Sequence, residues 1–346
     1  QFHPVKENDE WWGKGFTEWT NVVKARPRFK GHYQPQLPAD LGFYDLRLEE
    51  ARLAQESLAK ENNIYGFCYY HYWFNGKRIL QEPINRKLKN PKEDLPFMLC
   101  WANENWTRAW DGRNHDILMK QDYDFDDDLA HIKFLIEIFK DPRYIRVNDK
   151  PVFVIYKPDL FPDMNKTLNI FREEAAKQKI ELHLIWFERY TGWTSEDLIS
   201  TNFDASVEFQ PLSKSYHTFK KLKKNQTDSW FAKKYKLYQY YINKKIIGLP
   251  YINPKSNNII SYKDFVDHDL ERGISPNTYP GVCPGWDNSS RRGKKGATIF
   301  INNTPEDFKK WIDGKEDQFK PEPEMGDFLF INAWNEWAEG NHLEPC

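Results

Sequence analysis

Residues 151–156, PVFVIY, form a short run of apolar and β-branched side chains in a chain that is otherwise rich in charge. Most such runs here are nearly continuous, which is typical of strands buried on both faces of a parallel sheet. The other strand candidates are residues 64–74, 96–101, 181–187, 205–209, 281–286 and 327–334. Helical patterns separate them, at residues 45–62, 127–140, 165–178, 228–242, 261–272 and 305–312.

Strands that alternate with helices predict a (β/α)₈ TIM barrel, formed by residues 1–346 as one domain. Gln1-Phe2-His3-Pro4 resembles the exit of a strand, so we expect the body of the first strand to lie upstream and the last helix to lie beyond Cys346. Residues 8–40 are expected to be an elaborated first βα loop, and residues 213–260 an elaborated loop with one helix. A doubly wound sheet is the alternative, but no glycine-rich phosphate loop follows a strand.

The composition excludes several classes of protein. Lys and Arg number 50 against 51 Asp and Glu, without a long basic tract, so no nucleic-acid partner is expected. No apolar run approaches the roughly 18 residues of a membrane span. The cysteines and histidines lack metal-binding spacing, so we expect neither a metal nor a cofactor. The compartment stays open between the cytoplasm and, if a leader was removed upstream, the periplasm or the exterior.

Aromatic, acidic and amide residues gather where the predicted strands end, the face on which barrel enzymes place their sites. The chain has 14 Trp and 18 Tyr, and such rings stack on sugars while carboxylates and amides bind hydroxyls, although they also serve as core filler. In the first loop, at residues 8–40, these residues are expected to form a substrate platform or lid; the alternative is a flap that only packs over the barrel rim. For Glu188, the alternative to substrate binding is an ion pair with Arg189. The predicted substrate-binding residues are Trp12, Glu18, Trp19, Tyr70, His71, Trp101, Asn103, Glu104, Trp106, Glu188, Glu208, Trp286, Asp287, Trp334 and Asn335.

Glu336 and Glu339 are the candidate catalytic carboxylates. They lie three residues apart after the last strand, a spacing that places both side chains on one side of a turn. Mutual repulsion and burial beside Trp334 and Trp337 would raise the pKa of one of them, giving a proton donor and a base. The alternative is a helix start with favourable acids in its first turn. If either acid points away from any cavity, or is locked in an ion pair with a basic side chain, the reason to call this protein an enzyme of sugars is removed.

Four long motifs resemble the WbsX-type proteins, which are described as glycosyltransferases of bacterial surface-polysaccharide gene clusters or as relatives of glycoside hydrolase family 99. The motifs are QFHPVKENDEWWGKGFTEW at residues 1–19, YYHYWF at 69–74, CWANENWTRAWDG at 100–112 and NAWNEWAEGNHLEP at 332–345. Family 99 comprises barrels that are endo-acting α-mannosidases and α-mannanases. Its Asn-Glu-Trp-His-Glu-Gly run is similar to residues 335–340 here, with Ala338 in place of the histidine.

The resemblance implies a retaining glycoside hydrolase acting on an oligo- or polysaccharide. Glu336 would be the base that deprotonates a sugar 2-hydroxyl, giving a 1,2-anhydro sugar, and Glu339 would protonate the leaving oxygen and then activate water. The alternatives are a glycosyltransferase or transglycosylase and a glycan-binding barrel without activity. A nucleotide-sugar enzyme often needs an Asp-x-Asp string; the one at Asp122-Tyr123-Asp124, with its neighbours, is better interpreted as a loop that caps the following helix.

Overall fold

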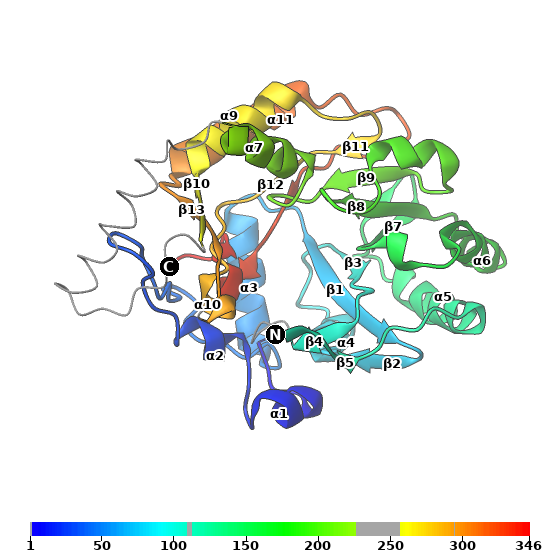
Figure 1. The fold of residues 1–346 in the computed structure, drawn as a ribbon. Coiled ribbons are helices and arrows are strands. Elements are labelled where there is room, and N and C mark those ends of the chain that lie inside the picture. The colour runs from blue at the N-terminus through cyan, green and yellow to red at the C-terminus, as the bar shows by residue number, and fades with distance from the viewer. Residues whose placement is uncertain (1, 109–112, 226–256, 294) are drawn as a thin grey trace.

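The computed structural model describes residues 2–108, 113–225, 257–293 and 295–346 (Figure 1). Each of the seven apolar runs contains a strand, as predicted. The strands are β1 (Phe67–Phe74), β3 (Phe97–Trp101), β7 (Lys150–Ile155), β8 (His183–Glu188), β9 (Ala205–Glu208), the pair β11 (Thr278–Tyr279) and β12 (Gly281–Val282), and β14 (Phe330–Ile331). The helix predicted at 228–242, and most of the 213–260 loop, lie outside the described residues.

The other five predicted helices are confirmed. They are α3 (Glu49–Glu61), α5 (Phe125–Phe139), α6 (Met164–Ala176), α9 (Tyr262–Arg272) and α11 (Pro305–Gln318). Thr304 caps α11 as its sequence indicates, because the Thr304 side chain accepts a hydrogen bond from the Asp307 backbone N–H. Further helices are α1 (Lys6–Trp12), α2 (Glu18–Val22), α4 (Glu82–Lys89), α7 (Lys214–Asn225) and α10 (Ser289–Arg292), with 3₁₀ turns η2 (Pro158–Leu160), η3 (Ser195–Ser200) and η5 (Trp337–Glu339).

The main sheet is parallel, and its strands stand in chain order. The order is β1-β3-β7-β8-β9-β11, and the same segment continues as β12, which pairs in parallel with β14. Because the order never reverses along the chain, the doubly wound alternative is wrong. Two short strands pair with this sheet in antiparallel orientation, β2 (Lys77–Ile79) with β1 and β6 (Arg146–Val147) with β7. Six others form separate two-stranded sheets: β4 (Trp106–Arg108) with β5 (Arg113–Met119), β10 (Asn258–Ser261) with β13 (Thr298–Ile301), and β15 (Asn335–Glu336) with β16 (Asn341–His342).

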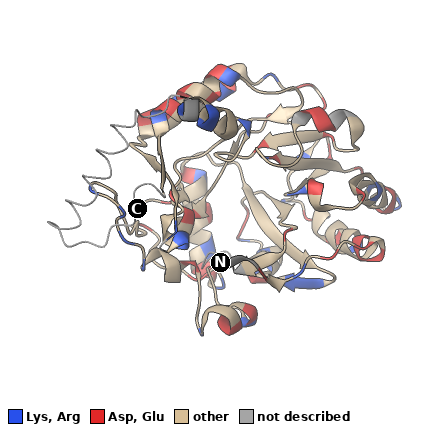
Figure 2. Ribbon diagram, in the orientation of Figure 1, with Lys and Arg blue, Asp and Glu red and all other residues tan. Residues whose placement is uncertain are grey.

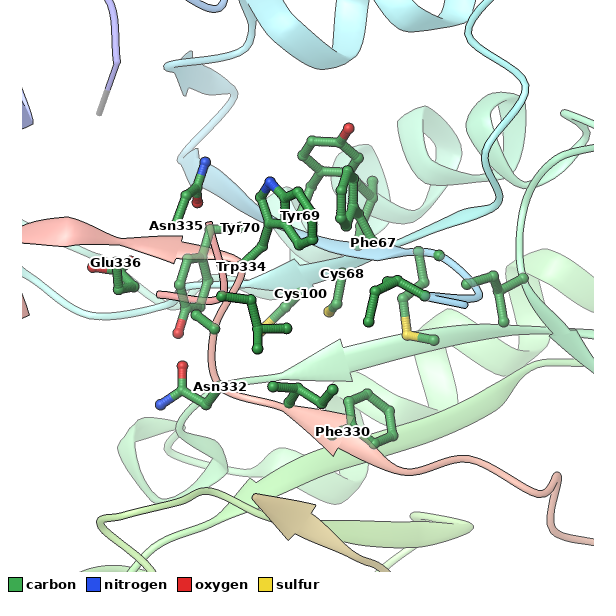
Figure 3. A pocket seen from close by; sticks show the side chains of 18 of the residues that line it. Phe67, Cys68, Tyr69, Tyr70, Cys100, Phe330, Asn332, Trp334, Asn335 and Glu336 are labelled. Carbon is green, nitrogen blue, oxygen red and sulfur yellow. The ribbon is translucent and has the colours of Figure 1, made fainter. Parts of the chain in front are cut away.

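The architecture is TIM-barrel-like, but the described residues do not close the barrel that we predicted. No ladder joins β1 to β14 among them, and a cavity of about 740 Å³, the gap cavity, lies between these strands (Figure 3). The two flanking strands are only partly buried, whereas β3 and β9 are buried at every position. Phe2 and His3 line the gap cavity, and the strand body expected upstream of them stays a prediction.

The backbones of β9 and β12 approach each other closely at Glu208 and Gly281. A Cβ atom on Gly281 would lie 1.9 Å from the Glu208 carbonyl oxygen, so only glycine fits there. Beyond the sheet, α5 and α6 cover the outer face of β7 and β8, while α9 and α11 pack beside β12 (Figure 1).

Helices α9 and α11 carry both acidic and basic side chains, whereas the charged side chains of α7 are all basic (Figure 2). Within the described ranges, every helix is too short or too polar to cross a bilayer.

Candidate functional site

A second cavity, the site cavity, has a volume of about 360 Å³ and lies where the strands end. It adjoins the gap cavity, because Tyr70, Phe209 and Glu336 line both. Its size falls at the lower end of the range for small-ligand pockets. The predicted residues on its wall are Trp12, Glu18, Tyr70, Glu104, Trp106, Trp286, Glu336 and Glu339.

Glu336 and Glu339 meet at one guanidinium on this wall. Glu336 Oε2 lies 2.8 Å from Arg291 Nη2, and Glu339 Oε1 lies 2.9 Å from Arg291 Nη1. Glu18 Oε1 approaches the same Nη2 at 2.6 Å, and it also accepts a hydrogen bond from the Ala338 backbone N–H at 3.1 Å. We call Arg291 and its three carboxylates the Arg291 cluster.

The Arg291 cluster holds more negative than positive charge, and its members differ in proton affinity. Burial raises the pKa of Glu339 to about 7; Arg291 opposes this rise, while Glu336 and Glu18 add to it. Burial also pushes the pKa of Glu18 upward, but Arg291, the chain's amino terminus and the hydrogen bond from the Ala338 backbone together hold that pKa below its usual value. Near neutral pH, Glu339 is therefore the carboxyl of the cluster that readily carries a proton.

The turn that presents Glu339 is fixed by its neighbours. Gly340 ends η5 with φ +54°, and a Cβ atom there would lie 2.8 Å from the Asp287 Cβ, so glycine suits both the backbone and the space. The Asp287 backbone N–H donates to the Glu339 carbonyl oxygen at 2.6 Å. Buried Glu344 accepts hydrogen bonds from Trp337 Nε1 at 2.6 Å and from Tyr44 Oη at 2.7 Å. Glu339 is thereby held without contributing its own carboxylate to the turn.

Aromatic rings form the rest of the wall. Trp12 stacks on Phe16 with ring centroids 5.7 Å apart, and Trp106 meets Tyr72 edge-on at 5.1 Å. Trp286 is 4% exposed on the same wall. Rings braced in this way offer faces for stacking on a sugar.

Glu104 lies on the wall at the exit of β3, where two cations approach it. It forms an ion pair with Lys157, and its Oε2 lies 4.0 Å from Arg189 Nη1. The ion pair between Glu188 and Arg189 stays an alternative; the carboxylate oxygen at 4.0 Å from Arg189 is that of Glu104.

Four predicted substrate-binding residues have structural places instead. Trp19 packs in a core with Phe2 and Trp337, and its Nε1 donates to the Tyr44 carbonyl oxygen. His71, which is 4% exposed at the edge of the gap cavity, contacts the buried His131 of α5 through ring nitrogens 2.9 Å apart. The remaining two are Trp101, which packs against Phe161 and Phe171 outside the sheet, and Asn103, whose amide bridges the backbone of Lys157.

Five further predictions also lie off the site cavity. Glu208 touches the gap cavity but is held by Lys315 at 2.6 Å and by Arg272. Asp287 is held by His32 at 2.7 Å. Glu188 is buried at the end of β8, away from the wall of the site cavity. The last two, Trp334 and Asn335, line the gap cavity (Figure 3).

Sequence reasoning missed the two arginines of the site cavity, Arg189 and Arg291. Arg189 was considered only as a partner of its neighbour Glu188. Arg291 follows the seventh strand end within the loop that begins at Trp286, so a search of whole loops for cations, beyond the strand ends themselves, would have found it.

Solved structures share this fold. The family 99 endo-α-mannosidase of Bacteroides thetaiotaomicron matches with a TM-score of 0.51 and 12% identity, over 89% of this chain and 77% of that one. A glycoside hydrolase-like protein matches with a TM-score of 0.52 and 12% identity, over 95% of this chain and 92% of that one. The fold is thus that of the TIM-barrel-like glycoside hydrolases.

Residues 1–346 match the family described as glycosyltransferase WbsX, and the chain belongs to this family, as its motifs indicated. The description places this family among carbohydrate-active proteins. Two relatives from Xanthomonas campestris pv. campestris, strains ATCC 33913 and B100, both called uncharacterized protein WxcX, are 40% identical over 349 residues. The match covers all of this chain but only 46% of each relative, so the chain spans about half the length of these relatives.

Proposed function

We propose that this chain is a retaining glycoside hydrolase that cleaves a glycosidic bond in a complex glycan, with Glu336 as base and Glu339 as acid. The observation that carries the proposal is the pair of carboxylates held on neighbouring nitrogens of one guanidinium at a cavity wall. Their environments push them toward different roles, because the pKa of Glu339 rises to about 7 through burial, partly opposed by Arg291.

The contact with Arg291 is the arrangement that, from sequence alone, we expected to argue against catalysis. The cluster differs from a simple ion pair, since one guanidinium faces three carboxylates. One positive charge cannot neutralise three negative ones, so the cluster favours retention of a proton. That proton resides best on Glu339, and Arg291 keeps both acids oriented toward the same side of the cavity.

In the first step that we propose, the sugar 2-hydroxyl gives its proton to Glu336, and its oxygen forms a bond to C1. The bond from C1 to the leaving oxygen breaks, and the leaving oxygen takes the proton of Glu339. In the second step, water gives a proton to Glu339 and attacks C1. The C1–O2 bond then breaks, and O2 recovers the proton from Glu336. Two inversions at C1 give overall retention.

A glycosyltransferase is the second candidate, favoured by the description of the family. The Asp122-Tyr123-Asp124 string gives it little support. Asp124 caps α5 by accepting a hydrogen bond from the Asp126 backbone N–H at 2.7 Å, and Asp122 pairs with Lys120. Calorimetric titration with nucleotide sugars distinguishes the two, since only the transferase needs a donor site for the diphosphate.

The direct test measures oligosaccharides released from a panel of bacterial and host polysaccharides. Glu336→Gln and Glu339→Gln should each lower release by about 10²- to 10⁴-fold, whereas Glu322→Gln, at an exposed position, should leave it unchanged. Full release by either of the first two variants would end the assignment. Binding of a glycan without release by the unaltered protein would identify a glycan-binding barrel instead.

A further inference from the structure

The guanidinium of Arg189 lies on the wall of the site cavity with its hydrogen-bonding capacity unused. The side chain is 15% exposed, and its closest carboxylate oxygen, Glu104 Oε2, is 4.0 Å away, which is too far for a hydrogen bond. Its Nε is buried without a partner. Within residues 2–108, 113–225, 257–293 and 295–346, no acceptor takes a hydrogen bond from this guanidinium. A guanidinium has five donors, and leaving them unmet in a partly buried place is costly.

Packing fixes the position of this cation. The guanidinium carbon of Arg189 lies 4.9 Å from the centre of the Tyr156 ring and 5.5 Å from that of Phe209, both of which also line the site cavity. Such cation–π contacts stabilise the charge without occupying the N–H groups, which point along the edges of the guanidinium plane. The donors are therefore held in place and available to a ligand.

The surrounding charges leave Arg189 without a full counter-ion. Glu104 is engaged by Lys157, which is in direct contact with it. Arg291, the other guanidinium on the wall, is occupied by the three carboxylates of its cluster. The two arginines thus differ in their anionic partners: Arg291 contacts three carboxylates, whereas the carboxylate nearest to Arg189 lies beyond hydrogen-bond distance.

We infer that Arg189 binds an anionic group of the glycan, a carboxylate or a phosphate, so that the substrate is an acidic saccharide. This inference rests on the proposed use of the site cavity for sugars. A planar guanidinium matches a carboxylate or phosphate through two parallel hydrogen bonds. A neutral hydroxyl would satisfy single donors but would leave the charge uncompensated. The acidic sugar would lie beside Tyr156 and Phe209 in the site cavity.

Binding of monosaccharides that differ only at carbon 6 tests this inference without any turnover. D-Glucuronic acid, D-glucose 6-phosphate and D-glucose would each be titrated into the full chain by calorimetry. We expect at least one anionic sugar to bind about 10-fold or more tightly than glucose, and the tighter of the two identifies a carboxylate or a phosphate as the natural group. Arg189→Gln should remove this preference. Arg86→Gln, an exposed arginine paired with Glu82, should retain it.

Equal affinity for the three sugars, failure of both anionic sugars to bind, or an undiminished preference in Arg189→Gln would overturn the inference. If thermal unfolding shows that Arg189→Gln is misfolded, Arg189→Lys serves instead. Lysine keeps the positive charge but cannot form two parallel hydrogen bonds to one anionic group, so this variant should lose most of the preference. These outcomes are separate from the hydrolase proposal. Anion-selective binding by a protein that releases no oligosaccharide would refute the proposed hydrolysis alone, and release from neutral glycans without anion selectivity would refute the role of Arg189 alone.

Discussion

Replacement of Glu339 by Gln should change how the stability of the protein depends on pH, even without a known substrate. Burial raises the pKa of Glu339 from 4.5 to about 7, against the opposing effect of Arg291. The folded protein therefore retains a proton that the unfolded chain releases once the pH exceeds about 4.5. The stability that this proton confers is complete below pH 4.5 and is lost as the pH rises through about 7.

The size of the effect follows from the shift. Each pKa unit corresponds to about 1.4 kcal/mol, so ionised Glu339 lowers the free energy of unfolding by about 3 kcal/mol at pH 8 relative to pH 4.5. Glutamine keeps the shape of the side chain and cannot ionise. Glu339→Gln should therefore gain about 2 to 3 kcal/mol over the unaltered protein between pH 5 and pH 8.

Urea unfolding at pH 5, 6, 7 and 8 measures this difference directly. Glu322→Gln is the matched control, because Glu322 is exposed and its substitution should leave the pH dependence unchanged. Parallel stability curves for the unaltered protein and for Glu339→Gln would refute the reasoning, since Glu339 would then hold no extra proton. The same result would remove the basis for its role as proton donor.

Four other substitutions separate the site from the scaffold. Arg291→Met should cost about 3 to 5 kcal/mol at pH 7 by urea unfolding, and less at pH 5, because its carboxylates can then take up protons. Trp12→Ala should weaken glycan binding roughly 10-fold in calorimetry with little effect on unfolding, whereas Trp19→Ala, in the core, should lower stability by about 3 to 5 kcal/mol. Lys315→Met should cost about 3 to 5 kcal/mol and leave glycan affinity unchanged, because this lysine lies buried between two carboxylates, away from the site cavity.

The strands and helices could be predicted from the sequence because local patterns determine them. A run such as residues 151–156 can be buried only as a central strand, and Thr304 followed by proline and acids is a strong helix start. Closure of the barrel is different in kind, since it depends on how the two ends of the sheet, at β1 and β14, meet, and these strands are far apart in the chain. Local patterns carry no information on that contact, and the described residues leave the two strands apart.

The errors in the site have one common physical cause. Polar and aromatic residues at strand ends were assigned to the cavity without regard to the face they occupy, although neighbouring residues in a strand face opposite sides. Tyr70 and Tyr72 line the site cavity, while His71 contacts His131 and Trp73 stacks on it, on the helix side of the sheet. Applying the two-residue alternation would have removed His71. Partners such as Arg291, from another loop, could not be found by any rule confined to strand ends.

The family is described as a glycosyltransferase and the structural neighbours as glycoside hydrolases, and the chemistry proposed here can give either outcome. In the proposed mechanism, Glu339 first protonates a leaving oxygen and then deprotonates whatever attacks C1. A water molecule in that place gives hydrolysis, and a sugar hydroxyl gives transfer to another glycan, while the Arg291 cluster performs the same two proton transfers. The outcome is set by which acceptor the aromatic wall holds beside Glu339. Added acceptor saccharides should therefore divert product from hydrolysis to transfer if the wall binds them, without any change in the dependence on Glu336 and Glu339.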